Sequence, residues 1–226
     1  MISAIIVAAG KGTRMGPDVD KLFLEVAGRP LVGHTWKRLD STPGLGEIIL
    51  VVRQGMESAF NELGKELGVQ RPFRLVPGGA ERQNSVWNGL QALAPATEIV
   101  IIQDGARPCT SMDVILKTVQ AALQDGAAVA AQRVTDTIKE SDGGTRIART
   151  VDRARLWAVQ TPQTFRVEVI RAALKAVLDR GLHVTDDTAA CELIGQSVTL
   201  VESLTPNPKA TSRADLPLLE TLLRQP

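Results

Sequence analysis

An apolar strand that runs directly into a glycine-rich turn is the feature that most constrains the fold of this chain. Residues 5–9 are the apolar run IIVAA, and residues 10–16 continue as GKGTRMG. Such a turn directs a row of backbone N–H groups toward one point, which suits a phosphate group. Arg14 and Lys21 add two cations close by. The segment therefore predicts an anion-binding loop after the first strand of an α/β sheet.

Three other interpretations compete with a nucleotidyl-transfer type of triphosphate site for this loop. A dinucleotide site needs an acidic residue after the second strand, but the second predicted strand, residues 47–53, ends in Arg53. Such an arginine would suit at most a 2′-phosphate. An ATP-type P-loop ends in Gly-Lys-Ser or Gly-Lys-Thr, which Lys11-Gly12-Thr13 does not match. The third alternative is that the glycines only make a tight turn between a strand and a helix.

Strand and helix patterns alternate along the rest of the chain. Strands are expected at residues 3–9, 47–53, 73–76, 98–103, 127–131 and 197–202, with helices between them. Such alternation predicts a mostly parallel sheet covered by helices on both faces. Residues 212–215 carry a capping signature for the last helix. In the helix near residue 112, apolar side chains recur at helical spacing. They are Ile115, Leu116, Val119 and Leu123.

Residues 133–157 interrupt this alternation because they show no helical period. They contain two alternating segments on either side of Asp142-Gly143-Gly144, a sequence typical of a β-hairpin turn. An isolated hairpin is marginally stable in water. We therefore expect a β-arm that packs against a second subunit and joins a homodimer. The alternative is a surface flap that the fold tolerates.

The composition excludes several classes of partner. The chain has 226 residues, enough for one large domain, and a net charge of +1. With 3% aromatic residues and no tyrosine, it has few means of binding or stacking nucleic acid. Cys109 and Cys191 make no metal-ligand spacing with His34 or His183, so we expect reduced thiols in the cytoplasm. No segment reads as a signal peptide or membrane span, so no membrane association is expected.

Polar and glycine-rich segments follow the expected strands, and ligands of open α/β sheets bind beyond the carboxyl ends of the strands. These segments are residues 10–14, 77–85, 104–108, 137–139, 160–163 and 205–209. They are rich in Lys, Arg, Thr and backbone N–H groups, which suits phosphoryl or nucleotidyl transfer. Asp104 is a candidate for holding Mg²⁺ or the acceptor. Taken singly, Asp104 also suits a helix N-cap and Arg107 a surface ion pair.

Eight motifs, taken in order over essentially the whole chain, resemble one family. They are AAGKGTRM, GGAERQNSVWNGL, QDGARP, DTIK, TVDRARLW, QTPQTF, TDDTAACE and NPKATSRADL. As a set they are similar to the 2-C-methyl-D-erythritol 4-phosphate cytidylyltransferases of non-mevalonate isoprenoid biosynthesis. The resemblance implies a single nucleotidyltransferase domain with a three-layer, Rossmann-like fold. It also implies transfer of CMP from CTP, with Mg²⁺, to the polyol phosphate, with release of pyrophosphate. A ribitol 5-phosphate cytidylyltransferase, or another polyol-phosphate nucleotidyltransferase, is the alternative.

The resemblance further implies roles for individual residues. The CTP site would comprise Ala8, Ala9, Gly10, Gly79, Ala80, Ser85, Asp104 and Ala106. The catalytic cations would be Arg14, Lys21 and Lys209, the first two at the five-coordinate α-phosphorus. The acceptor would be held by Arg107, Thr137, Arg153, Thr161 and Thr185, together with Lys209. In the family the arm embraces a second subunit, so Thr137 and Arg153 would serve the partner's site. Thr185 alternatively caps a helix that begins at the acidic pair after it.

Four positions depart from the family's usual residues. Gln103 stands where histidine is frequent, Gly105 where alanine is common, and Asn84 where aspartate is frequent. Pro208 replaces a residue with a backbone N–H next to Lys209. That change bears on the acceptor contacts and not on the reaction.

Two functions of other classes compete with nucleotidyl transfer. An NADP-dependent oxidoreductase could use the same first turn, but it would need a proton donor such as tyrosine, which the chain lacks. A non-catalytic nucleotide-binding module would have no need of both Arg14 and Lys21. The residues therefore favour an enzyme that transfers a nucleotidyl group.

Overall fold

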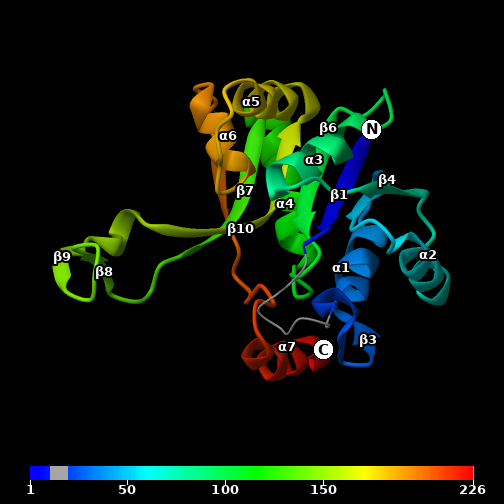
Figure 1. The fold of residues 1–226 in the computed structure, drawn as a ribbon, viewed down its shortest axis with the longest axis horizontal. Helices are drawn as coiled ribbons and strands as arrows, with labels where there is room; N and C mark the ends of the chain where they lie inside the picture. Colours follow the sequence, from blue (N-terminus) through cyan, green and yellow to red (C-terminus); the bar gives the residue numbers. More distant parts are fainter. Residues whose placement is uncertain (11–19, 226) are drawn as a thin grey trace.

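The computed structural model of the chain describes residues 1–10 and 20–225, with helices on both faces of a central sheet (Figure 1). Arg14 lies outside the described residues. Seven described strands form the sheet: β1 (Ile2–Ala8), β4 (Leu45–Val52), β5 (Phe73–Pro77), β6 (Ile99–Asp104), β7 (Ala127–Arg133), β10 (Trp157–Arg166) and β11 (Thr199–Glu202). Their order is β11-β7-β10-β6-β1-β4-β5. β10 is antiparallel to β6 and β7, and the other neighbouring pairs are parallel.

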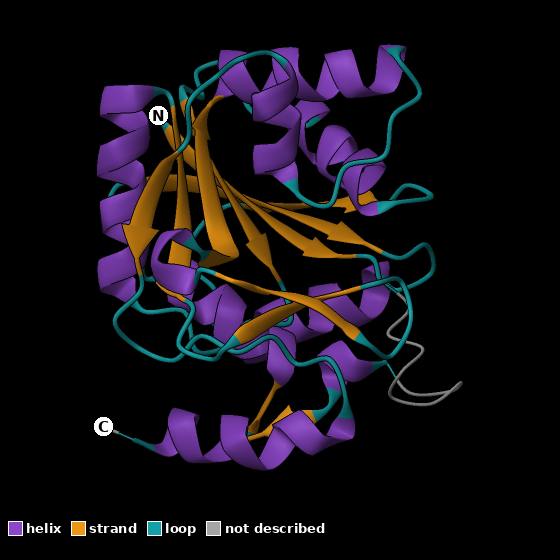
Figure 2. Cartoon of the chain, turned by 90° about the vertical axis from the view of Figure 1, so that its left-hand side faces the viewer, coloured by secondary structure: helices purple, strands orange, loops and turns teal. Residues whose placement is uncertain are grey.

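Two sets of helices cover the sheet, one on each face. The first set is α1 (Leu31–Asp40), α2 (Glu57–Glu66) and α4 (Met112–Asp125), and the second is α3 (Arg82–Gln91), α5 (Val167–Asp179) and α6 (Asp187–Leu193). The last helix, α7 (Leu216–Arg224), adds apolar side chains to the first cluster but lies beyond the end of the sheet, against β2 (Glu25–Val26). Strand side chains alternate between the faces, so Ile6 packs with the first set and Ile5 with the second. Figure 2 shows the twisted sheet between these layers. The predicted three-layer, mostly parallel α/β fold is confirmed.

β10 differs from the sequence-based prediction. We expected a short return strand from the hairpin with residues 160–163 in a loop after it, whereas β10 extends from Trp157 to Arg166 and includes them, with an irregularity in its pairing between Val159 and Gln163. The prediction was wrong because the buried side chains here are polar, and polar runs resemble loops. These polar side chains form hydrogen bonds with residues far away in the sequence: Gln163 donates to Asp186 at 3.0 Å, and Thr164 donates to Thr118 at 2.9 Å.

α4 begins at Met112 as expected, but its buried face differs from the prediction. Leu116 and Leu123 are 40% and 44% exposed. Smaller or β-branched side chains face the interior instead: Val114, Ile115, Thr118, Val119 and Ala122. The leucines were taken to mark the buried face, whereas the sheet is contacted mainly by side chains that allow a close approach.

The hairpin predicted within residues 133–157 is present. Strands β8 (Ile138–Ser141) and β9 (Ile147–Val151) pair antiparallel, and they extend as an arm away from the body of the chain (Figure 1). Their side chains are mostly exposed, and Ile147 is exposed by 66%. Within this one chain, the arm therefore packs against little besides itself.

Shorter elements complete the described fold. They are η2 (Lys21–Phe23), β2 (Glu25–Val26), β3 (Arg29–Pro30), η3 (Arg153–Arg155) and η4 (Arg213–Asp215). The capping box predicted at residues 212–215 is present at the start of η4. Glu220 of α7 accepts a hydrogen bond from the backbone N–H of Ala27 at 2.6 Å, which ties α7 to the β2–β3 turn. None of the helices in the described part of the chain combines the length and apolarity of a membrane span.

Candidate active site

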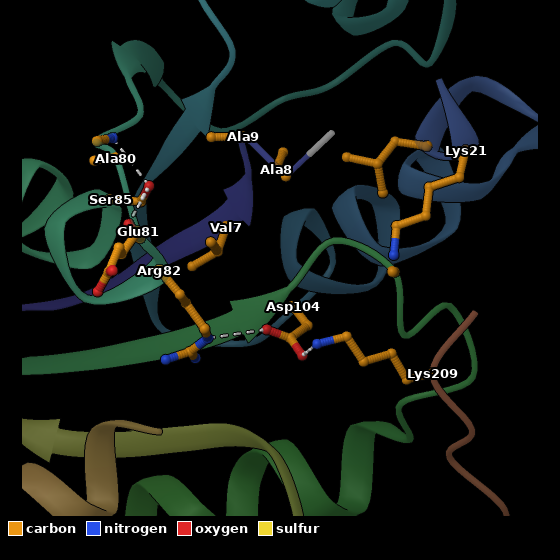
Figure 3. Close-up of a pocket in the computed structure, with 14 residues that line it drawn as sticks. Val7, Ala8, Ala9, Lys21, Ala80, Glu81, Arg82, Ser85, Asp104 and Lys209 are labelled. Atoms are coloured by element: carbon orange, nitrogen blue, oxygen red, sulfur yellow. Dashed lines mark hydrogen bonds and ion pairs between the residues drawn. The ribbon is translucent and has the colours of Figure 1, made fainter. Parts of the chain in front are cut away.

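Two adjoining cavities form the candidate site, and we call them the larger and the smaller cavity. The larger cavity, of about 490 Å³, opens at the carboxyl ends of β1 and β6, beside the first turn of α3 (Figure 3). Its lining residues are Val7, Ala8, Ala9, Gly10, Lys21, Leu22, Gly79, Ala80, Glu81, Arg82, Ser85, Asp104, Ala106 and Lys209. All eight residues predicted for a CTP site are among them, with two of the three predicted catalytic cations. Residues from four of the six polar segments named from the sequence therefore meet in this cavity, and none from residues 137–139 or 160–163 lines it.

A tight loop between β5 and α3 forms one side of the larger cavity. A Cβ on Gly78 would lie 2.2 Å from the Cβ of Ala9, so no larger residue fits there. Ser85 uses its hydroxyl twice in shaping this loop: it accepts from the N–H of Gly79 at 3.0 Å and donates to the carbonyl of Glu81 at 3.1 Å. Ser85 therefore holds the backbone groups that a ligand would meet.

Lys21 reaches the larger cavity from a short helical turn. Lys21 is the first residue of η2, which Asp20 caps by accepting from the N–H of Leu22 at 3.1 Å. The Nζ atom of Lys21 donates to the carbonyl of Ala210 at 3.0 Å. Asp20 also pairs with Arg53 at 3.0 Å. The arginine considered as a 2′-phosphate contact therefore braces the turn that carries Lys21.

Asp104, at the end of β6, is surrounded by cations. Lys209 Nζ lies 2.7 Å from its Oδ2, Arg82 Nε 3.5 Å from its Oδ1, and Arg107 Nε 3.8 Å from its Oδ2. Figure 3 shows Arg82 and Lys209 on opposite sides of the carboxylate. Burial alone would raise the pKa of Asp104, but these cations, Arg82 foremost, lower it. The interpretation of Asp104 as the cap of α4 is wrong, because Ser111 holds that position.

A second cavity of about 150 Å³, the smaller cavity, adjoins this cluster. Its lining residues are Arg82, Asp104, Arg107, Val159, Gln160, Thr161, Gln163, Thr185, Asp186 and Lys209. Arg82, Asp104 and Lys209 line both cavities and form a shared wall between them. The smaller cavity also brings together the predicted acceptor residues Arg107 and Thr161 with Thr185.

Asn207 fixes two of these acceptor candidates and the segment that carries Lys209. Arg107 Nη1 donates to the carbonyl of Asn207 at 2.6 Å, and Asn207 Nδ2 donates to the carbonyl of Thr161 at 2.9 Å. The Thr161 hydroxyl in turn accepts from the backbone N–H at the end of β6 at 3.1 Å. These contacts anchor the chain immediately before Pro208, two positions from Lys209.

Thr185 lines the smaller cavity immediately before α6. The interpretation that it caps this helix is wrong. Asp186 is the N-cap, since its side chain accepts from the N–H of Ala189 at 2.9 Å.

The remaining departures from the family pattern line neither cavity. Gln103 is buried and donates to the Thr110 hydroxyl at 2.9 Å. Asn84 accepts from the N–H of Glu81 at 3.2 Å and so closes the first turn of α3. Gly105 packs against α1, where a Cβ would lie 3.3 Å from Val32. These residues therefore shape elements around the site.

Thr137 and Arg153, predicted to hold the acceptor, line neither cavity of their own chain. Both belong to the arm region, and Arg153 donates to the backbone carbonyl of Thr135. The structure thus brings together the acceptor candidates of the chain body and leaves these two apart.

The described residues of this site do not form a metal-binding group. Within residues 1–10 and 20–225, no three His, Cys, Asp or Glu side chains gather in a metal-binding group. The two oxygens of Asp104 face Arg82 and Lys209, so its carboxylate is a poor candidate for a Mg²⁺ ligand.

Comparison with known proteins decides the family. Residues 2–225 match the model of the 2-C-methyl-D-erythritol 4-phosphate cytidylyltransferase family. The chain belongs to this family. A relative of that name from Pelotomaculum thermopropionicum is 40% identical over 99% of this chain and 94% of its own length. Another from Geobacillus kaustophilus is 43% identical over 97% of this chain and 96% of its own length.

Solved structures of the cytidylyltransferase family share the whole fold. The 4-diphosphocytidyl-2C-methyl-D-erythritol synthase of Anaerococcus prevotii aligns with a TM-score of 0.88 at 32% identity, over 99% of this chain and 96% of that one. The 2-C-methyl-D-erythritol 4-phosphate cytidylyltransferase of Thermus thermophilus aligns with a TM-score of 0.82 at 31% identity, over the full length of both chains. The arm and both cavities lie inside the aligned region.

Arg82 and Asp187 of this cytidylyltransferase-family chain are candidates that the sequence reasoning missed. Arg82 Nη1 lies 2.8 Å from Oδ2 of Asp187, which is fully buried. Burial raises the pKa of Asp187, and Arg82 opposes that rise. One signal was available: a cation in the first turn of a helix opposes the helix dipole. Because Arg82 is the first residue of α3, the sequence could have predicted that an acidic partner or a ligand offsets this unfavourable position.

Proposed function

We propose that this chain transfers CMP from CTP to 2-C-methyl-D-erythritol 4-phosphate, giving 4-CDP-2-C-methyl-D-erythritol and pyrophosphate. The wall shared by the two cavities, Arg82, Asp104 and Lys209, carries this proposal. CTP in the larger cavity and a polyol phosphate in the smaller one would meet at a surface with two cations. The names of the relatives support the choice of acceptor.

The proposed chemistry needs positioned cations more than a base. An oxygen of the acceptor phosphate bonds to the α-phosphorus of CTP, and the bond to the pyrophosphate leaving group breaks. A phosphate monoester is largely dianionic at neutral pH, with a second pKa of about 6, so the attacking oxygen carries no proton. Lys21 would stabilise the charge that grows at the α-phosphorus. Arg14 is proposed for the same role, and Lys209 for the acceptor phosphate.

The acceptor is proposed to contact residues from two subunits. Arg107, Thr161 and Thr185 of one chain line the smaller cavity. Thr137 and Arg153 of the partner's arm would complete it, because a dianionic phosphate needs several donors and cations. We also propose that Mg²⁺ enters with CTP, held by the triphosphate oxygens that this ion prefers. When bound, it would neutralise part of the phosphate charge.

A cytoplasmic location is part of the proposal. CTP is available there, and the two cysteines are free. Burial raises the pKa of Cys109 to about 11 and that of Cys191 to about 12. Both thiols therefore stay protonated and unreactive at neutral pH, as a reducing compartment allows.

We expect CTP to be strongly preferred over UTP, ATP and GTP. Ala8, Gly79 and Ala80 line the larger cavity, and backbone groups there that pair with the 4-amino group of cytosine would be unpaired with UTP. Each unpaired group costs about 1–3 kcal/mol, so kcat/KM with UTP should fall by a factor of about 5 to 150 for each such group. Pyrophosphate release, measured with the four nucleotides and a panel of polyol phosphates, checks this.

The same panel tests the function as a whole. Turnover with 2-C-methyl-D-erythritol 4-phosphate and CTP supports the proposal. Faster turnover with ribitol 5-phosphate would favour the alternative acceptor, and equal rates with CTP and UTP would contradict the nucleotide assignment. No pyrophosphate with any polyol phosphate would overturn the proposed reaction.

We further propose that residues 1–226 form one domain and that residues 133–157 join two copies into a homodimer. The arm is largely exposed in the single chain, which leaves it available to a partner. Replacing residues 140–148 with a short turn should therefore raise the dimer dissociation constant. Analytical ultracentrifugation at micromolar concentration measures this change, and calorimetry with CTP serves as the control because the larger cavity lies in the chain body. A monomeric intact protein would contradict the proposal.

A further inference from the structure

Three consecutive residues tie the start of α3 to the segment before and at the start of α6. The pairs are Glu81 with His183 at 2.6 Å, Arg82 with Asp187 at 2.8 Å, and Gln83 with Leu182 and Val184 at 2.8 and 3.0 Å. The first segment borders the larger cavity, and the second borders the smaller one. The segments that border the two cavities are thus also joined by direct side-chain contacts, in addition to the three residues that line both cavities.

Arg82 differs from its two neighbours because it has a partner on each side. Its Nη1 contacts the fully buried Asp187, and its Nε faces Oδ1 of Asp104. The buried carboxylate is a fixed anchor, because α6 holds Asp187 in the protein interior. The guanidinium is planar and rigid, so a contact at one end orients the other.

Asp104 is in turn held at both of its oxygens. Arg82 faces Oδ1, and Lys209 lies 2.7 Å from Oδ2. Without Arg82, the carboxylate could turn about its side-chain bonds, and Lys209 would follow it. Asp104 would then share its Coulombic attraction between Lys209 and Arg107 alone, which lies 3.8 Å away, so it would hold the ammonium group of Lys209 more strongly and leave it less available to a substrate phosphate.

We propose that Arg82 is a positioning residue: anchored by Asp187, it fixes the Asp104 carboxylate and thereby places Lys209 for the acceptor phosphate. This inference rests on the proposed function. It assigns Arg82 an indirect role, through Lys209, even though its side chain lines both cavities.

The test removes both charges of the anchor pair together. Arg82→Gln alone would leave Asp187 as a buried carboxylate without a cation, which endangers folding. The double variant Arg82→Gln/Asp187→Asn replaces the ion pair with two amides that can hydrogen-bond. A matched control, Arg74→Gln/Glu47→Gln, neutralises another arginine–carboxylate pair, at 2.7 Å, whose members line neither cavity. Thermal unfolding checks the fold of each variant.

The double variant should raise the KM for the acceptor about tenfold and change the calorimetric Kd of CTP less than about twofold, as expected for coupling through a neighbouring residue. In a Lys209→Ala background, the same double substitution should change the acceptor KM less than about twofold, because the residue it acts through is gone. Arg82→Lys, which keeps the charge but not the rigid fork, should give an intermediate acceptor KM. The control pair should match the wild type.

Two results would overturn the inference. An equal loss of CTP affinity would make Arg82 a direct nucleotide contact, and an undiminished effect in the Lys209→Ala background would show that it does not act through Lys209. If the double variant does not fold, Arg82→Lys decides, and a wild-type acceptor KM in that variant counts against the inference. A wild-type chain without turnover would overturn the proposed function, whereas an active wild type with an unaffected double variant overturns only this inference.

Discussion

Replacing Lys21 with alanine should lower kcat by about 100-fold or more, the range seen when one electrostatic stabiliser of a transition state is removed. Lys21 lines the larger cavity, where the α-phosphorus of CTP would gain charge during attack. An interaction that strengthens only in the transition state lowers kcat more than it raises KM. Initial rates of pyrophosphate release at saturating substrates measure this effect.

Structural damage must be separated from lost chemistry in this variant, because Lys21 also donates to the carbonyl of Ala210 at 3.0 Å. Calorimetry with CTP and thermal unfolding should show a folded protein that still binds the nucleotide. Lys175→Ala is a suitable control, since it removes an exposed lysine from α5, paired with Asp179 at 2.6 Å. Normal turnover in Lys21→Ala would remove this lysine from the mechanism.

The fold was predictable where the local pattern and the tertiary environment agree. The apolar run of β1 is buried on both faces of the sheet, and a continuous apolar run before a glycine-rich turn is typical of a central parallel strand. The extension of β10 beyond the expected return strand was missed because the polar side chains of Gln163 and Thr164 are buried with partners far along the chain. In α4, Leu116 is exposed although its residue type favours burial. Local patterns do not contain that information.

The candidate site was predictable to the extent that it lies at strand ends. Parallel strands bring their carboxyl ends to one edge, and residues from all the predicted polar segments except 137–139 line the two adjoining cavities. The links between them were not predictable, because Asp104 and Lys209 are 105 positions apart, as the hydrogen bond joining them shows. The pairing of Arg82 with Asp187 likewise arises only when α3 and α6 pack on the same face.

Mixing an Arg153→Ala chain with a Lys21→Ala chain should restore activity that neither variant has alone. Arg153 lines neither cavity of its own chain, whereas Lys21 lines the larger one. If the arm serves the partner's site, one site of the mixed dimer contains both lesions and the other contains neither. Up to about half of wild-type activity per mixed dimer should then return, by the reciprocal pairing of a two-fold dimer. Differently tagged chains, purified in tandem and assayed at low acceptor concentration, measure the recovery.

The decisive control uses two residues that each serve the site of their own chain, so that each substitution disables only the site of the chain that carries it. Arg107 lines the smaller cavity of its own chain, so a mixed dimer of Arg107→Ala and Lys21→Ala should have one lesion in each site and recover nothing. Arg153→Ala alone should raise the KM for the acceptor far more than that for CTP, because its guanidinium would meet only the acceptor phosphate. If purified Arg153→Ala/Lys21→Ala dimers recover no more than the Arg107 control, Arg153 serves its own subunit. The arm would then join the two chains without completing either site.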